Sequence, residues 1–331
     1  MGDERTRRAV AAATAAARDL DLTVTDPVVL HDLFSVVVHL APAPVVARVP
    51  TVVPEPLRAD TAAQATRMLD ELDVVAWLAG RGFPVVAPSP LVPAEPVERD
   101  GFAMTFWEHL DVVPGAHPDH LRETAALPGL HAELAGYPRE LPLLTSLDDT
   151  IPACLTQLRD HPELIHPDEL DRARREWDLL APVVTTRAGL RKEFPGIRLQ
   201  PIHGDSPVYN VIATTSGNVY ADFEMTCLGP VEWDLALSGE EAVDAYDTAA
   251  AVLGRPPVDR RLLTVMEAGR MLQVVACLAL VPRLPQLADG LAGVLDQWRD
   301  SPIAGGLTDE HAEAPEPETE PAKAGTREPF A

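Results

Sequence analysis

Near two thirds of its length, the chain carries the stretch His203-Gly204-Asp205-Ser206-Pro207-Val208-Tyr209-Asn210, and Asp222-Phe223-Glu224 follows twelve residues after Asn210. An Asp that can orient a hydroxyl group, an Asn five residues on and a second Asp after a following strand are the parts that hold a magnesium nucleotide against an acceptor in phosphoryl-transfer enzymes. The stretch therefore predicts a phosphoryl-transfer site.

A β-hairpin is predicted between Asn210 and Asp222. Two short apolar runs flank the turn-forming sequence Thr214-Thr215-Ser216-Gly217-Asn218. If the hairpin closes symmetrically about Ser216, Asn210 lies opposite Asp222, about 4.5–5.5 Å away, and the two side chains can share one hard cation. Magnesium favours such oxygen donors and completes its shell with water and substrate phosphates. Asn210 and Asp222 are therefore predicted metal ligands.

Asp205 lies in the loop that leads into this hairpin. Its carboxylate could accept a hydrogen bond from an incoming hydroxyl group and orient it toward a phosphate. The alternative is a structural turn, in which Gly204 takes an unusual backbone angle and Asp205 caps a local amide. The offsets to Asn210 and Asp222 favour Asp205 as the catalytic base, and His203 is interpreted as a buried support for the loop.

A helix predicted over Leu57–Ala79 carries one carboxylate on its apolar side. On a helical wheel, Glu71 falls inside the arc formed by the apolar residues of this helix. A carboxylate that faces inward needs a partner. The nearest candidate is Arg48, the only cation of the predicted strand Val45–Val49, and it could bridge Glu71 and the phosphates of a nucleotide. The alternative is a half-exposed Glu71 with a solvent-facing Arg48.

The pattern of apolar residues predicts an α+β fold, in which a small antiparallel sheet with one helix precedes a mainly helical part. Strands are predicted at Ser35–Leu40, Val45–Val49, Val85–Ala87 and Phe102–Leu110. Helices are predicted at His120–Ala135, Asp168–Leu190, Ser238–Ala251, Asp259–Leu280 and Leu284–Arg299. The predicted divisions are an N-terminal helix (1–25), a nucleotide-binding lobe (26–110), a helical lobe with the catalytic loop and substrate site (111–301) and a disordered acidic, proline-rich tail (302–331).

The composition narrows the possible partners. The 331 residues are 46% hydrophobic, enough to bury a sizeable core. A formal net charge of -24 would repel nucleic acids and anionic lipids and would attract a cationic substrate, although acidity can also serve solubility alone. Three widely separated cysteines indicate neither a disulfide framework nor a zinc site. No run of about 18 uncharged apolar residues is present, so the cytoplasm is the expected location.

These motifs together resemble the aminoglycoside phosphotransferase family, which shares a protein-kinase-like two-lobe fold with choline and homoserine-type small-molecule kinases. The resemblance covers roughly residues 28–300. Besides the motifs above, it rests on the segments Val45-Val46-Ala47-Arg48-Val49, Trp77-Leu78-Ala79, Met104-Thr105-Phe106-Trp107-Glu108-His109-Leu110 and Gly229-Pro230-Val231-Glu232-Trp233-Asp234-Leu235-Ala236.

The resemblance implies transfer of the γ-phosphate of ATP, with Mg²⁺, to a hydroxyl group of a small molecule such as an aminoglycoside or an amino alcohol. It implies that Asp205 is the catalytic Asp, that Asn210 and Asp222 bind magnesium, and that Arg48, paired with Glu71, replaces the phosphate-binding lysine. The backbone of the segment Trp107, Glu108, His109 would be the hinge that binds adenine. Asp234 would support the catalytic loop, with capping of a helix as its alternative.

Three residues depart from the family pattern. Arg48 stands in place of lysine, Pro207 stands where the family commonly has His, and Tyr209 replaces a small residue before the Asn. They motivate a second hypothesis, a kinase-like pseudoenzyme that binds nucleotide or a partner without transferring phosphate. A third hypothesis is a metal-dependent hydrolase built on His203 and the two Asp residues of the motifs. Acidic residues of the helical part, including Asp148, Asp149, Glu240, Glu241 and Asp244, could receive a polyamine or be solvated helix faces.

Overall fold

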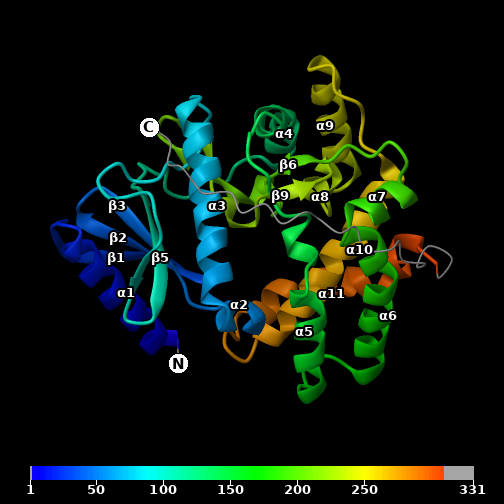
Figure 1. Ribbon diagram of the computed structural model, residues 1–331, viewed down its shortest axis with the longest axis horizontal. Helices are drawn as coiled ribbons and strands as arrows, with labels where there is room; N and C mark the ends of the chain where they lie inside the picture. The colour runs from blue at the N-terminus through cyan, green and yellow to red at the C-terminus, as the bar shows by residue number, and fades with distance from the viewer. Residues whose placement is uncertain (1, 309–331) are drawn as a thin grey trace.

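The first lobe is built on one antiparallel sheet. A computed structural model describes the backbone of residues 2–308, and Figure 1 shows the sheet at one end of the molecule and a mass of helices at the other. The sheet has the order β1-β2-β3-β5-β4. Its strands are β1 Val24–Asp32, β2 Ser35–Pro42, β3 Val45–Pro50, β4 Val97–Arg99 and β5 Phe102–Glu108. The predicted α+β, kinase-like fold class is confirmed.

Two helices cover opposite faces of this sheet, α1 Gly2–Asp19 and α3 Thr61–Gly80. Alternate residues of a strand point to opposite faces. Accordingly, Ala47 packs in the cluster that contains the buried alanines of α1, while Val46 packs in the cluster that contains the apolar face of α3. The predicted N-terminal helix is therefore an integral layer of the first lobe. It holds the outer face of the sheet, so that the inner face, with Arg48, is turned toward α3.

Several predicted boundaries differ from the structure. The single helix predicted over Leu57–Ala79 is two helices, α2 Glu55–Ala59 and α3, because Asp60 interrupts it and caps α3 by accepting a hydrogen bond from Ala63 N–H at 2.9 Å. The predicted strand Val85–Ala87 is only an isolated bridge from Val85. Strand β1, which carries Pro27, was not predicted; an edge strand tolerates proline because one side of its backbone forms no ladder.

The second lobe is mainly helical, as predicted. Its helices are α4 His120–Leu134, α5 Thr150–Gln157, α6 Pro167–Val184, α7 Arg187–Glu193, α8 Val231–Leu235, α9 Glu240–Val252, α10 Arg260–Cys277 and α11 Leu287–Asp300. The helix predicted over Asp168–Leu190 ends early because Thr186 caps a new helix, α7, by accepting from Gly189 N–H. The segment 260–280 is long and apolar enough to cross a membrane, but 72% of its most apolar window is buried inside the protein. Helix α10 is thus the central helix of this lobe.

Two small ribbons carry the predicted site. They pair β6 Gln200–Ile202 with β9 Cys227–Gly229, and β7 Val211–Thr214 with β8 Gly217–Tyr220. Short 3-10 helices lie at Thr145–Leu147, Leu158–Asp160, Pro207–Asn210, Phe223–Met225, Leu278–Leu280 and Ile303–Gly306. The two ribbons bring the segments that follow β6 and β8 to one place.

The predicted register of the β7–β8 hairpin is wrong by one residue. Thr214 pairs with Gly217, so the turn contains two residues rather than closing symmetrically about Ser216. As a result Ala221, not Asp222, lies opposite Asn210, and Ala221 N–H donates to the Asn210 carbonyl at 2.8 Å. Asp222 comes next, in a left-handed conformation with φ of 61°. The chain therefore turns at Asp222 instead of continuing the strand.

The acidic tail was predicted to begin at Pro302, and this boundary is wrong. Ala304 is fully buried and its N–H donates to Glu176 Oε1 at 2.8 Å, while Leu307 is 5% exposed. The chain is thus packed against the helical lobe as far as this point. Residues 309–331, which hold the acidic part of the predicted tail, lie outside the described residues.

Candidate active site

The loop after β6 has a backbone that its glycine makes possible. Gly204 has φ of 86°, a conformation that residues with a Cβ rarely adopt, and a Cβ at this position would overlap the Met225 carbonyl oxygen. His203 is fully buried, and its Nε2 lies 2.9 Å from the Ala221 carbonyl oxygen. His203 is therefore engaged as a support of the loop, which argues against a metal-ligand role for it in a hydrolase.

Replacing Gly204 by Ala is expected to lower the free energy of unfolding by about 3 kcal/mol, from overlap with Met225 and from left-handed strain. Thermal denaturation measures the change. The matched control is Gly129→Ala in α4, where a Cβ meets no atom within 4 Å and alanine is favoured in a helix by about 0.5–1 kcal/mol. Equal thermal stability of the two variants would contradict this reading of the loop.

Asp234 fixes the same loop from behind. It is fully buried, and its carboxylate accepts from His203 N–H at 2.9 Å and from Gly204 N–H at 2.7 Å. His131 Nε2 lies 3.0 Å from it, and Tyr246 Oη lies 2.8 Å from the other ring nitrogen of His131. Of the two roles considered for Asp234, these contacts fit support of the catalytic loop, because α8 has no side-chain cap.

Burial acts to raise the pKa of Asp234, but the hydrogen bonds and charges of His131, His203 and Gly204 outweigh it and hold the pKa below its usual value. A carboxyl group whose pKa is lowered on folding stabilises the protein above its unfolded-state pKa, and this contribution is lost as pH falls through the folded-state pKa. Asp234 therefore stabilises the fold at neutral pH and ceases to do so only under strongly acidic conditions.

Asp234→Asn is accordingly expected to cost about 3 kcal/mol of unfolding free energy at pH 7, because an amide cannot accept from all of these donors. The deficit relative to wild type should shrink below about pH 4, where the unfolded chain binds the proton. Urea denaturation at pH 7 and at pH 3.5 measures both values. A deficit that stays constant with pH would show that the Asp234 charge is not the cause.

Asp205 has a half-exposed carboxylate, with 45% of the side chain open to solvent. Its Oδ1 lies 3.2 Å from Arg270 Nη1, and its Oδ2 lies 3.4 Å from Asn210 Nδ2. The same Asn210 nitrogen donates to the Asp205 carbonyl at 2.8 Å. The amide nitrogen of Asn210 is thus turned toward Asp205, and its amide oxygen points away from that residue. Arg270 was not predicted, although a cation within the apolar helix α10 was a signal of the kind that singled out Glu71.

Arg48 gathers three carboxylates on the other side of the site. The predicted ion pair between Arg48 and Glu71 is present. Arg48 Nη1 also lies 2.7 Å from Asp222 Oδ1 and 2.9 Å from Glu224 Oε2. Burial, together with the neighbouring carboxylates, raises the pKa of Glu71 to about 8 and that of Glu224 to about 7, although Arg48 opposes both shifts. The site thus has more negative charge than one guanidinium can balance.

This donor set fits magnesium. Asp222 and Glu224 supply carboxylate oxygens, Asn210 supplies an amide oxygen, and hard cations prefer such ligands. Three carboxylates surround the single guanidinium of Arg48, and a divalent cation would add positive charge beside them. The predicted ligands Asn210 and Asp222 therefore remain the candidates, with Glu224 as a neighbour that the sequence reasoning did not single out.

The predicted hinge segment consists of the last two residues of β5, Trp107 and Glu108, and of His109 after it. Trp107 is buried and its Nε1 donates to Thr105 Oγ1 at 2.9 Å, so its ring is part of the core. Glu108 N–H donates to the Ala87 carbonyl at 3.0 Å, and His109 N–H donates to the Pro44 carbonyl at 3.1 Å. These two donors are already used within the protein. A nucleobase at this edge would need acceptors here or donors from residues after His109.

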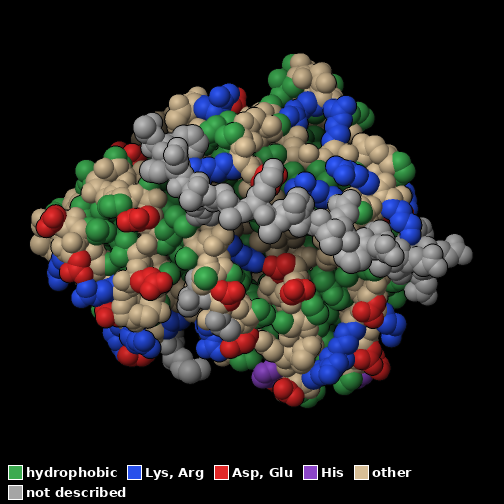
Figure 2. All heavy atoms as spheres, in the orientation of Figure 1, with side chains coloured by type: hydrophobic (Ala, Val, Ile, Leu, Met, Phe, Trp, Pro, Cys, Tyr) green, Lys and Arg blue, Asp and Glu red, His purple; other side chains and the backbone are tan. Residues whose placement is uncertain are grey.

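Two of the acidic residues considered as a binding site for a polyamine form ion pairs with arginines. Asp148 is ion-paired with Arg67 at 2.5 Å, and Asp244 with Arg260 at 2.6 Å. Figure 2 shows acidic and basic side chains interspersed over the visible face. These two carboxylates are therefore not free charges waiting for a ligand.

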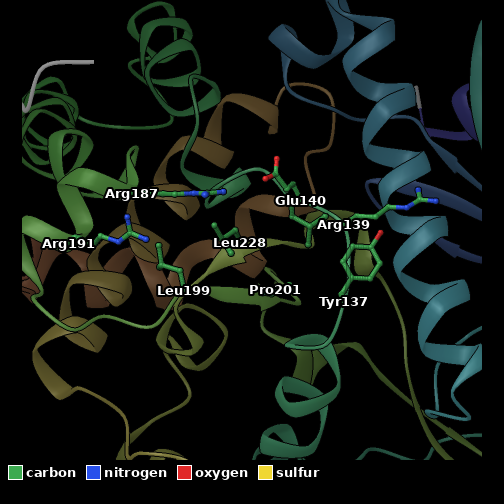
Figure 3. Close-up of a pocket in the computed structure, with 9 residues that line it drawn as sticks. Tyr137, Arg139, Glu140, Arg187, Arg191, Leu199, Pro201 and Leu228 are labelled. Atoms are coloured by element: carbon green, nitrogen blue, oxygen red, sulfur yellow. The ribbon is translucent and has the colours of Figure 1, made fainter. Parts of the chain in front are cut away.

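A pocket of about 260 Å³ lies apart from these residues. Figure 3 shows Arg187 and Arg191 of α7 on one side of it and Leu228 and Pro201 of the β6–β9 ribbon near its centre, while Arg139 points toward α3. None of the residues predicted for the site lines this pocket. The candidate active site is instead the cluster of polar side chains around Arg48, Asp222, Asn210 and Asp205.

Comparisons with known proteins place the chain in a family and identify its fold. The sequence profile described as the phosphotransferase enzyme family matches residues 36–270. Similar solved structures include the GDP and kanamycin complex of APH(2")-IIia, with a TM-score of 0.55 and 15% identity, covering 87% of this chain and 98% of that chain. The choline kinase LicA from Streptococcus pneumoniae has a TM-score of 0.55 and 10% identity, covering 87% of this chain and 99% of that chain. No curated protein matches the sequence.

The structural likeness, at such low identity, concerns the fold. The family profile, by contrast, spans most of the chain and includes Arg48, Glu71, Asp205, Asn210 and Asp222. The chain therefore belongs to the phosphotransferase enzyme family and is a small-molecule phosphotransferase.

Proposed function

We propose that the protein transfers the γ-phosphate of ATP, with Mg²⁺, to a hydroxyl group of a small molecule, either an aminoglycoside-like compound or an amino alcohol. The observation that carries the proposal is that two groups of side chains lie next to each other. Asp205 contacts Asn210, whose carbonyl accepts from Ala221 N–H, and the next residue, Asp222, is held by the Arg48–Glu71 pair. These are the groups that phosphoryl transfer needs for positioning and charge neutralisation. The cytoplasm, which supplies the nucleotide, is the expected site of action.

The acceptor hydroxyl group would be oriented by Asp205. One oxygen of this carboxylate is held by Arg270, while the other has only the long 3.4 Å contact with Asn210 and is the better placed to accept from a substrate. Bound magnesium would neutralise charge on the transferred phosphate and hold it in line. Arg48 would exchange part of its contact with Asp222 for phosphate oxygens, while Glu71 keeps the guanidinium in place.

The choice of nucleotide is open to a direct test, since three solved structures of similar fold are described as GDP complexes. Wild-type protein is incubated with Mg²⁺ and either [γ-³²P]ATP or [γ-³²P]GTP, and with kanamycin, choline, aminopropanol or water as acceptor. We expect labelled product from ATP with at least one amine-bearing alcohol and little label without Mg²⁺. Transfer from GTP alone would correct the nucleotide, and transfer to none of a broad alcohol panel would reject the enzyme activity.

The pseudoenzyme hypothesis makes a different prediction in the same assay. Tyr209, one of the three departures from the family pattern, has 71% of its surface exposed, so it does not displace Asp205 or Asn210. Pro207 begins the short helical turn that ends at Asn210 and leaves the Asn210–Asp205 contact intact. We therefore favour an active enzyme. Nucleotide binding without transfer to any acceptor or to water would favour the pseudoenzyme instead.

A further inference from the structure

Arg270 is a buried cation that lies directly against Asp205. It sits in the middle of α10 with 5% of its surface exposed. Its Nη1 lies 3.2 Å from Asp205 Oδ1 and 2.8 Å from Gln273 Oε1, and its Nη2 donates to the Gly204 carbonyl at 3.3 Å. The guanidinium lies 4.0 Å from the centre of the Trp233 ring. Arg270 thus contacts both the carboxylate and the backbone of the catalytic loop.

Holding a guanidinium at this position is costly for the fold. The desolvation free energy of a buried charge often exceeds the stabilisation from its partner. A protein with an apolar side chain of similar volume at such a position is often equally stable. Within residues 2–308, the Nε of Arg270 is buried and has no hydrogen-bond partner. The backbone of the loop is moreover already fixed by Asp234, which accepts from Gly204 N–H, and by Trp233, whose Nε1 donates to the Gly204 carbonyl at 2.7 Å. Stability of the loop alone does not account for this charge.

The two oxygens of the Asp205 carboxylate are treated differently by their surroundings. Oδ1 is tied to Arg270, whose own orientation is set by Trp233 on one side and Gln273 on the other. Among the residues that the structure describes, Oδ2 makes only the long contact with Asn210. A charge-assisted contact on one oxygen restricts rotation of the carboxylate and leaves the second oxygen in a defined direction. Arg270 thus fixes the carboxylate, whereas the loop backbone is held mainly by the shorter hydrogen bonds of Asp234 and Trp233.

We propose that Arg270 is a positioning residue for the phosphoryl transfer: it holds Asp205 Oδ1 so that Oδ2 faces the acceptor hydroxyl group. The proposal rests on the proposed function, because it assigns Asp205 the role of orienting the acceptor. It also gives the site a second buried arginine. Arg48 contacts the carboxylates on the proposed nucleotide side, and Arg270 contacts Asp205 on the proposed acceptor side.

The first test separates positioning from stability. Arg270→Met is expected to lower kcat about 10- to 100-fold, within the range attributed to a well-placed acid or base, while the KM for Mg-ATP changes less than about threefold. Arg270→Lys, which keeps the charge, should recover part of the loss. The matched control is Arg172→Met in α6. Arg172 also lies over a tryptophan ring, 4.6 Å from its centre, and donates to backbone carbonyls, but none of these contacts involves Asp205. A loss of kcat that is equal in both variants would overturn the proposal.

The second test asks whether Arg270 acts through Asp205. In a double-mutant cycle with Asp205→Asn, Arg270→Met should have little further effect on residual ADP release, because the group it positions is gone. The thermal midpoints should also be non-additive, since the two side chains are in contact. Independent, additive losses in both measurements would refute the assignment. A wild-type protein that turns over no nucleotide would reject the proposed function, whereas the stability cycle would still report on the Arg270–Asp205 contact.

Discussion

Asp205→Asn is expected to lower the rate of phosphate transfer by about 10³-fold, within the range of about 10²- to 10⁴-fold that general acid–base groups contribute. The substitution keeps the size of the side chain but removes the charge that orients the acceptor hydroxyl group. The loop should keep its shape, because Asp234 and Gly204 fix it through the backbone. Initial rates of label transfer from [γ-³²P]ATP to the best acceptor measure the effect.

Binding of Mg-ATP should survive this substitution, because Asp205 is not among the groups gathered around Arg48. Isothermal titration of Asp205→Asn with Mg-ATP provides this comparison. A suitable control is Asp244→Asn, which removes a surface carboxylate paired with Arg260 and should leave both rate and affinity unchanged. If Asp205→Asn retained more than half of the wild-type rate, the assignment of Asp205 would be wrong.

Asp222→Asn should produce the second large effect, a loss of about 10³-fold in kcat/KM, because a metal ion contributes several kcal/mol of transition-state stabilisation. We expect this substitution to lower activity without lowering thermal stability. Three carboxylates crowd one guanidinium in this cluster, so neutralising Asp222 relieves repulsion with Glu224. The variant should therefore be at least as stable as wild type while it requires far more Mg²⁺ for turnover.

The measurement is a Mg²⁺ titration of ADP formation for both proteins, alongside their thermal midpoints. Glu71→Gln is the informative comparison, because Glu71 contacts the same arginine from α3 but is 2% exposed. Glu71→Gln should lower kcat/KM for ATP, but it should change the Mg²⁺ concentration needed for turnover less than Asp222→Asn does. An unchanged Mg²⁺ requirement in Asp222→Asn would remove Asp222 from the list of metal ligands.

Local spacing explains what the sequence could predict. The offsets among Asp205, Asn210 and Asp222 lie within one loop and one hairpin, and the inward position of Glu71 follows from helical periodicity alone. The pairing of Glu71 with Arg48 could be predicted because each was an isolated charge in an apolar element. These predictions needed little knowledge of how the lobes pack.

The remaining features depend on details that the sequence pattern does not determine. A two-residue turn instead of a symmetric one moved the partner of Asn210 from Asp222 to Ala221. The contact of Arg270 with Asp205 spans 65 positions of the chain, and it requires α10 to pass beside the catalytic loop. Such contacts are set by packing of the whole helical lobe, so neither periodicity nor spacing could identify them.

The most direct test of the central claim is a crystal structure of the protein with Mn²⁺ and a non-hydrolysable ATP analogue, recorded with anomalous scattering from manganese. The account predicts an anomalous peak in contact with Asn210 Oδ1 and a carboxylate oxygen of Asp222, with the γ-phosphate of the analogue facing Asp205. Manganese bound away from both Asn210 and Asp222, or a nucleotide whose phosphates lie away from Arg48 and Asp205, would contradict it.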